Sequence, residues 1–165
     1  MVESLSEEEK VDFSERHSFL AFERFKEAEE CFEGGKYPAC IYDCYYSVFH
    51  ITKAVLYLLG VEAQTHNEVY RMISLHLFSK KEEGKVLSRI FLQLRNLRNS
   101  IDYDVLFYFN VGGRKGLIHE AKKALEDANC YITVMEKIRK RLIEEMKRDR
   151  KEIICTKAET ESEDD

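Results

Sequence analysis

The chain has 165 residues, of which 44 % are hydrophobic and 35 % charged, with a net charge of −5. This length and balance are typical of one folded domain and exclude an intrinsically disordered chain. One proline and seven glycines are too few for the tight turns of a β-sandwich or barrel, and no apolar run reaches the roughly 18–20 residues that span a bilayer. The acidic start MVESLSEEEK lacks the apolar stretch of a secretory signal, so we expect a cytoplasmic protein without a membrane contact.

The apolar spacing predicts helices along almost the whole chain. Ala21, Phe25, Ala28 and Phe32 step by four, three and four, and Gly34-Gly35 ends this first helix. A second helix begins near Pro38, whose fixed φ suits a first turn, and stops at Gly60. A third opens at residues 65–68, where Thr65 and Glu68 have the spacing of a capping box, and runs to about Phe78.

Two further helices complete the predicted fold. The fourth carries apolar residues between Leu87 and Ile101, and the fifth keeps alternating steps of four and three from Leu117 to Leu142. A mean spacing of 3.5 residues is typical of a seam between nearly parallel helices. We therefore predict an all-α, up-and-down bundle of four main helices and one short one, formed by residues 1–152 as a single domain.

Between the last two helices lies an unusually apolar connection, residues 105–111, which is the one segment with strand-like character. Apolar side chains left in water are a liability, so this segment either covers the end of the bundle or packs on another chain. The second alternative predicts self-association.

Charge is distributed unevenly. Residues 1–33 carry eleven acids and four bases, whereas residues 137–151 carry eight bases and three acids. This basic strip has two interpretations: a surface that attracts phosphate, or a solvated helix end whose cations suit the negative pole of the helix. The acidic segment 153–165 is predicted to be a disordered tail.

The five cysteines, an odd number in a chain without an export signal, predict reduced thiols rather than disulfides. Cys40 and Cys44 stand one helical turn apart and could form half of a metal site. No Cys-x-x-Cys pair or histidine cluster completes it, so we expect buried structural thiols and neither metal nor cofactor.

Two groups of residues have side chains suited to chemistry. The second helix contains Tyr42, Tyr45, Tyr46, Phe49 and His50, whose polar atoms either fix the register of the bundle or line a pocket for a nucleotide. On the fourth helix, Arg95, Arg98 and Asp102 form a polar stripe beside the apolar seam. Two guanidinium groups in that place need an acid, a phosphate or a partner chain, and Arg98 and Asp102 are spaced to pair.

Several segments, in their order and spacing over about residues 14–140, resemble the HEPN domain family, in particular its small stand-alone prokaryotic branch. The matching segments are Gly35-Lys36-Tyr37-Pro38-Ala39, Tyr45-Tyr46-Ser47-Val48-Phe49-His50, Lys53-Ala54-Val55-Leu56, Gly60-Val61, Thr65-His66, and Arg98 with Asp102-Tyr103-Asp104. The resemblance implies an all-α bundle that forms a homodimer. It also implies a minimal nucleotidyltransferase as partner in a toxin–antitoxin-type pair.

In the active branch of that family, a ribonuclease that needs no metal uses an Arg, a polar neighbour and a His four to six positions later. Arg98 and Asn99 match the first two, but no His stands at the third position, and the next one downstream is His119. Asp102 is a poor general acid at neutral pH, so this departure argues against catalysis. His50 or His66 would have to replace the missing group.

The resemblance thus implies a protein that binds nucleotide or RNA. Arg95, Arg98, Asn99, His50 and His66 are the predicted phosphate-binding residues, and Asp102 holds the arginines. In the family, a tyrosine near this motif receives AMP from the nucleotidyltransferase, which marks Tyr103. Two alternatives remain: an RNA endonuclease toxin that uses Arg98 and Asp102 for catalysis, and a helical adaptor without enzymatic activity.

Overall fold

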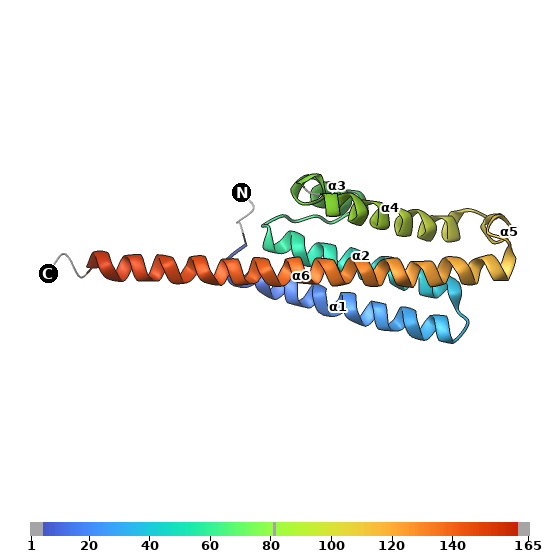
Figure 1. The fold of residues 1–165 in the computed structure, drawn as a ribbon, viewed down its shortest axis with the longest axis horizontal. Coiled ribbons are helices and arrows are strands. Elements are labelled where there is room, and N and C mark those ends of the chain that lie inside the picture. Colours follow the sequence, from blue (N-terminus) through green and yellow to red (C-terminus); the bar gives the residue numbers. More distant parts are fainter. Residues whose placement is uncertain (1–4, 81, 162–165) are drawn as a thin grey trace.

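A computed structural model describes residues 5–80 and 82–161, and within these ranges the chain is helical with no strand. Helices α1 (Glu7–Glu33), α2 (Tyr37–Leu58), α4 (Glu82–Tyr103) and α6 (Gly113–Glu161) run alternately up and down (Figure 1). The shorter α3 (His66–His76), a 3₁₀ turn η1 (Phe78–Lys80) and α5 (Phe107–Asn110) lie in the connections. The predicted all-α bundle with four main helices is confirmed.

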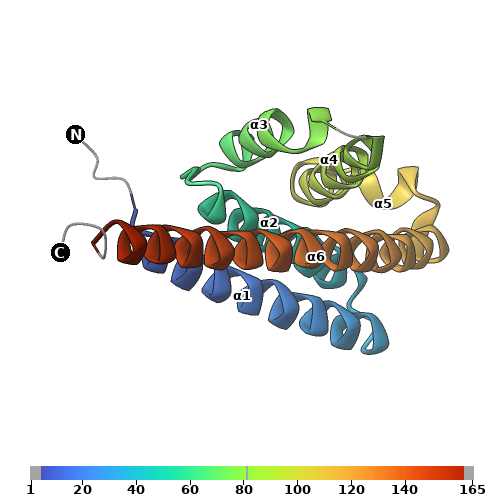
Figure 2. The same cartoon turned by 60° about the vertical axis from the view of Figure 1, so that its left-hand side comes forward.

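Helix α2 is the centre of the molecule. Helices α1 and α6 pack against it on one side, and α3 and α4 lie on the other, as the turned view in Figure 2 shows. Its sequence is apolar around most of its girth, which is typical of a helix with neighbours on several sides. The fully buried side chains include Ile41, Tyr45, Val48, Ile51 and Leu56.

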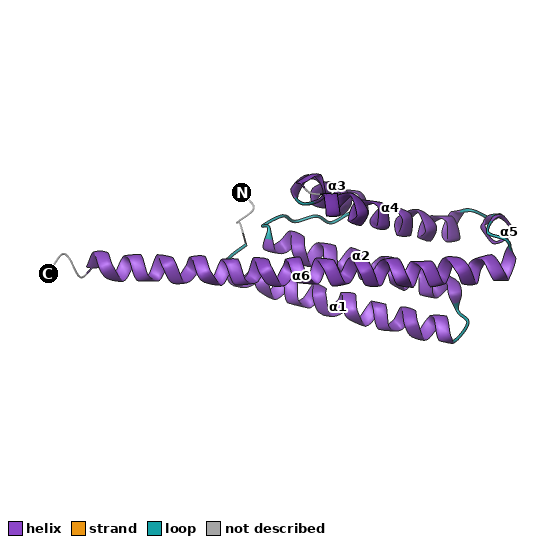
Figure 3. Cartoon of the chain, viewed as in Figure 1, coloured by secondary structure: helices purple, strands orange, loops and turns teal. Residues whose placement is uncertain are grey.

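The ends of the helices follow the signals in the sequence. The Thr65 hydroxyl accepts a hydrogen bond from the Glu68 amide at 3.2 Å, and the Glu68 carboxylate accepts one from the Thr65 amide at 3.1 Å, as the predicted capping box requires. Gly34 caps α1, and Gly35 follows with a φ of +71° that favours glycine. The connection from α1 to α2 is therefore short (Figure 3).

The connection at residues 105–111 is helical where the sequence had suggested strand character. It contains α5, and Gly112 and Gly113 then take φ values of +92° and +70° to turn the chain into α6. Positive φ values suit glycine. Because α5 and this turn occupy the connection, residues 105–111 contain no extended segment that could form a strand. Phe107 and Val111 pack on the core, whereas Val105 and Phe109 are 92 % and 75 % exposed.

Helix α6 continues through Glu161 and projects beyond the rest of the bundle (Figure 1). It therefore passes residue 152, where the sequence analysis ended the domain, and residues 162–165 of the predicted acidic tail lie outside the described residues. The division into a domain and a tail stays a prediction. None of the described helices combines the length and the hydropathy that a membrane span requires.

Candidate functional site

A pocket of about 340 Å³ lies where the N-terminal end of α3 meets the C-terminal half of α4. It brings together four residues that the sequence analysis selected from two separate segments: His66, Arg95, Arg98 and Asn99. The remaining residues that line it are Tyr45, Thr65 and Asn67. The four predicted residues line one pocket, so a single ligand could contact all of them. That they bind phosphate stays a prediction.

Arg98 is held on several sides but keeps donors to spare. One terminal nitrogen donates to the Asn99 side chain at 3.0 Å and lies 3.5 Å from the Asp102 carboxylate, and the other donates to the Tyr46 hydroxyl at 3.4 Å. The guanidinium also lies over the Tyr42 and Tyr46 rings. Its buried Nε has no hydrogen-bond partner among the described residues. A buried donor without an acceptor is unfavourable, so the hydrogen-bonding capacity of this guanidinium is not fully satisfied by the protein.

Arg95 is fixed by α3. It donates to the Asn67 side chain at 3.0 Å, and its guanidinium lies 5.4 Å from the centre of the Tyr70 ring. Asn67 is the second residue of α3, so the cap at Thr65 that starts this helix also sets the position of the partner of Arg95.

His66 is oriented by a buried tyrosine of α2. The Tyr45 hydroxyl lies 2.7 Å from His66 Nδ1, and it makes no other hydrogen bond within the described part of the chain. Burial raises the pKa of Tyr45, so the hydroxyl stays protonated and donates a hydrogen bond to Nδ1. We therefore assign the ring proton of neutral His66 to Nε2, which makes this side of the ring a hydrogen-bond donor.

The local electrostatic field is positive although the whole chain is acidic. Burial lowers the pKa of His66, and the charges of Arg98, Arg95 and Lys53 lower it further. Three cations thus act on one neutral ring. A site of this kind attracts an anion and hydrogen-bonds it through guanidinium and imidazole donors.

His50 lies beside the pocket rather than in it. Its Nδ1 faces His17 Nδ1 on α1 at 3.0 Å, and the Phe49 ring separates it from His66. The two nitrogens are much closer than the ring centres, which are 5.3 Å apart, so the rings share one N–H···N hydrogen bond. The predicted contact of His50 with phosphate has no geometric support from this arrangement and stays a prediction.

This histidine pair predicts a pH-dependent stability. Burial, followed by the charge of Lys53, lowers the pKa of both His17 and His50 to about 4, whereas an unfolded histidine has a pKa near 6.5. The unfolded chain therefore binds more protons between these values, and stability falls as the pH drops from about 6.5 to about 4. Replacing both residues with Gln should make the free energy of unfolding, measured in urea from pH 7.5 to 4.5, less dependent on pH. Parallel pH profiles for the two proteins would contradict this.

The remaining predicted residues lie at the end of α4. Asp102 forms the predicted ion pair with Arg98, and Tyr103, the candidate acceptor of AMP, is 79 % exposed. Next to it, the Asp104 carboxylate accepts a hydrogen bond from the Leu106 amide at 2.9 Å, which fixes the start of the apolar connection. Tyr103 is thus accessible to another protein, and its modification stays a prediction.

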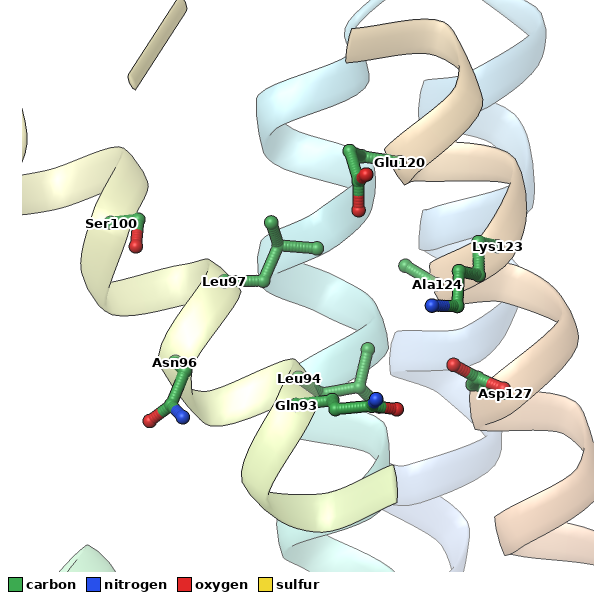
Figure 4. A pocket seen from close by; sticks show the side chains of 9 residues that line it. All are labelled: Gln93, Leu94, Asn96, Leu97, Ser100, Glu120, Lys123, Ala124 and Asp127. Carbon is green, nitrogen blue, oxygen red and sulfur yellow. The ribbon is translucent and has the colours of Figure 1, made fainter. Parts of the chain in front are cut away.

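A second cleft, of about 320 Å³, lies on the side of α4 that faces α6. In Figure 4, Leu94 and Leu97 point from α4 towards α6, and Lys123 and Asp127 point back from α6. Burial raises the pKa of Asp127. The C-terminal half of α4 is therefore flanked by an open space on each side, and only one of the two contains the arginine residues.

Comparisons with known proteins show the family of this chain. The model of the HEPN domain family matches residues 15–147. The chain belongs to the HEPN domain family. Within 82 residues it is 39 % identical to a UPF0332 protein of Pyrococcus horikoshii, a match that covers 50 % of this chain and 58 % of that protein's length. It is 24 % identical over 124 residues to a protein of Methanocaldococcus jannaschii named as a candidate toxin, which covers 75 % of this chain and 87 % of that protein.

Four residues of this HEPN chain that line the site or act on its side chains were not predicted as site residues: Thr65, Asn67, Tyr70 and Lys53. Asn67 and Tyr70 follow Thr65-His66 on one turn of α3, which places them near any ligand of His66. The short distance of Asn67 and Tyr70 from His66 along the helix was therefore enough to predict them as site residues. The pairing of His50 with His17 was not visible, because it depends on how α1 packs against α2.

Proposed function

We propose that this HEPN-family protein binds a nucleotide or RNA through the pocket of Arg95, Arg98 and His66. In this proposal it is a homodimer that works with a minimal nucleotidyltransferase in a toxin–antitoxin-type pair. The observation that carries the proposal is the Arg98 guanidinium, which lies in a cationic pocket with one buried N–H left without an acceptor. The relative from M. jannaschii named as a candidate toxin supports the toxin-type role.

The homodimer is supported by the exposed apolar residues around α5. Tyr103, Val105, Leu106 and Phe109 are each at least 58 % exposed and adjoin one another along the chain. Asp104 lies within this patch and Arg114 follows it along the chain, so the patch can complement itself across a two-fold axis. In this arrangement Tyr103 lies at the edge of the interface.

The test of the pocket measures binding of AMP by calorimetry to the wild-type protein and to Arg98→Gln. A charged hydrogen-bonding group contributes about 1.5–3 kcal/mol, so we expect Arg98→Gln to weaken binding by at least about tenfold. Arg89→Gln, an exposed arginine on the same helix, is the matched control and should bind as the wild type does. Equal affinities for all three proteins would contradict the proposal.

The test of the partner mixes the protein with the nucleotidyltransferase of the pair and labelled ATP, and then locates the label. We expect the label on Tyr103 and none on Tyr103→Phe. If the protein takes up no label and forms no complex with the nucleotidyltransferase on a sizing column, it is neither the target nor the partner of that enzyme. The helical adaptor would then be the better description, provided that another protein binds around α5.

One observation favours a second function, the RNA endonuclease. His66 lines the same pocket as Arg98, and so supplies an imidazole that the segment after Arg98 lacks. Its Nε2–H can donate a hydrogen bond to a phosphate oxygen, and only the protonated imidazolium form of His66 would give a proton to a leaving oxygen, whereas Asp102 is engaged by Arg98. Cleavage of RNA that is lost in both His66→Gln and Arg98→Gln would establish this function. Intact RNA after hours with the wild-type protein would exclude it.

A further inference from the structure

Beyond the pocket, α2 has one face that the neighbouring helices cover only in part: His50 and Tyr57 contact α1, and Arg98 of α4 lies over Tyr46. Its half-buried side chains after Ala39, apart from Asp43, step by four, four, three and four residues, which places them within one side of the helix. They are Tyr42, Tyr46, His50, Lys53 and Tyr57. The partly covered face of an otherwise buried helix therefore consists of aromatic, imidazole and ammonium groups.

Lys53 lies at the end of this face that is farther from the arginine pocket. Its ammonium lies 5.9 Å from the centre of the Phe49 ring and 5.8 Å from that of Tyr57, and it makes no ion pair within 4 Å among the described residues. The Tyr57 ring stacks on Phe13 of α1 at 5.1 Å, nearly parallel. A half-buried cation between aromatic rings is suited to hold a phosphate while a base stacks on the rings.

This end is continuous with the arginine pocket. Phe49, under Lys53, lies 4.5 Å from the ring of His66, which lines the pocket. Arg98 lies over Tyr46, and Lys53 follows Tyr46 by seven residues on the same helix, a rise of about 10 Å. A strand of nucleic acid rises about 3.4 Å per phosphate along the helix axis, so a strand of a few nucleotides is long enough to reach from one cation to the other.

We propose that the ligand is a single-stranded oligonucleotide, and that Lys53, Tyr57 and Phe13 form a second subsite next to the arginine pocket. This inference rests on the proposed function, because the first subsite is the pocket of Arg95 and Arg98. A mononucleotide would occupy that pocket alone. A longer strand would extend along α2, with its phosphates on Arg98 and Lys53 and a base on the Tyr57 ring.

The experiment compares AMP with single-stranded oligoadenylates of two, four and six nucleotides, with binding measured by fluorescence anisotropy or calorimetry. We expect the affinity to rise by at least about tenfold between AMP and the hexanucleotide. Tyr57→Leu should lower the affinity for the hexanucleotide about tenfold and leave that for AMP unchanged. Lys53→Gln should also lower the affinity for the hexanucleotide about tenfold, and this loss should exceed any loss for AMP, because the Lys53 charge also acts on the pocket. Arg98→Gln should weaken both ligands. Lys122→Gln, an exposed lysine on α6, is the control for charge and should change neither.

The outcomes separate the two proposals. Affinity that does not depend on length, or Lys53→Gln and Tyr57→Leu variants that bind the hexanucleotide as the wild type does, would overturn the second subsite and leave the proposed function in place. Absence of binding to AMP and to every oligonucleotide would overturn the proposed function itself. If the two variants change only the dimer equilibrium on a sizing column, the face contacts a second copy and is no RNA subsite. Melting temperatures of all variants show that each is folded.

Discussion

Phe91→Ala should lower the free energy of unfolding by about 3–5 kcal/mol, the range typical of removing a buried aromatic ring. Phe91 on α4 is fully buried, and its ring contacts those of Tyr45, Tyr70 and Tyr131. These three rings come from α2, α3 and α6, so the cavity left by the alanine would weaken the packing of α4 on all three of these helices. The neighbouring helices cannot close this space without moving the pocket.

Urea unfolding followed by circular dichroism measures this loss. Val86→Ala on the same helix removes a side chain that is 43 % exposed and should change stability by about 0.5 kcal/mol or less. A change below about 1 kcal/mol for Phe91→Ala would mean that α4 is not packed on the core as described. In that case the position of Arg95 and Arg98 would be in question as well.

The second large effect is expected for Glu136→Ala, at about 3–5 kcal/mol. Glu136 on α6 accepts two hydrogen bonds from Arg139, at 2.7 and 2.9 Å, and one from the Ser18 hydroxyl of α1 at 3.0 Å. Arg139 is only 9 % exposed, and its second terminal nitrogen already lacks a partner among the described residues. The alanine would leave this buried charge without its counter-ion.

The double variant Glu136→Leu with Arg139→Met is the matched test, because it removes both charges and keeps similar volume. We expect it to recover most of the stability lost in Glu136→Ala, since replacing a whole buried ion pair by apolar side chains is often close to neutral. Burial acts to raise the pKa of Glu136, but its hydrogen bond and ion pair with Arg139 hold that pKa below the usual value. The stabilisation from this pair is therefore present at neutral pH and is lost as the pH falls through that lowered pKa. Similar losses in the single and the double variant would contradict the ion-pair explanation.

Much of the fold followed from the sequence because spacing and capping act locally. The Thr65–Glu68 capping box, the glycine that ends α1 and the seam of α6 depend on neighbours within a few turns. The connection at 105–111 was harder to predict, because its apolar composition suits both a strand and a partly exposed helical turn. Only the backbone turn at Gly112 and Gly113 decides between them.

The site was predictable in part for the same reason. Arg98, Asn99 and Asp102 lie within two turns of one helix, so their grouping could be inferred from spacing. The hydrogen bond between Tyr45 and His66 joins residues 21 positions apart, and that between Arg95 and Asn67 joins residues 28 positions apart. Such contacts depend on the angle between α2, α3 and α4. Packing between residues far apart in the sequence, such as the contacts of Phe91 with Tyr45 and Tyr70, holds these helices together, and no local signal predicts it.

The open cleft behind α4 has a consequence for ligand affinity. Because α4 has few neighbours on α6, its C-terminal half can separate from the bundle by local unfolding more easily than α2, which is enclosed. Only molecules in which this half of α4 is packed on the bundle can bind the ligand. The apparent dissociation constant is inversely proportional to the fraction of such molecules. Substitutions in the cleft between α4 and α6 would therefore change the affinity for the ligand, although the cleft lies on the other side of α4 from Arg95 and Arg98.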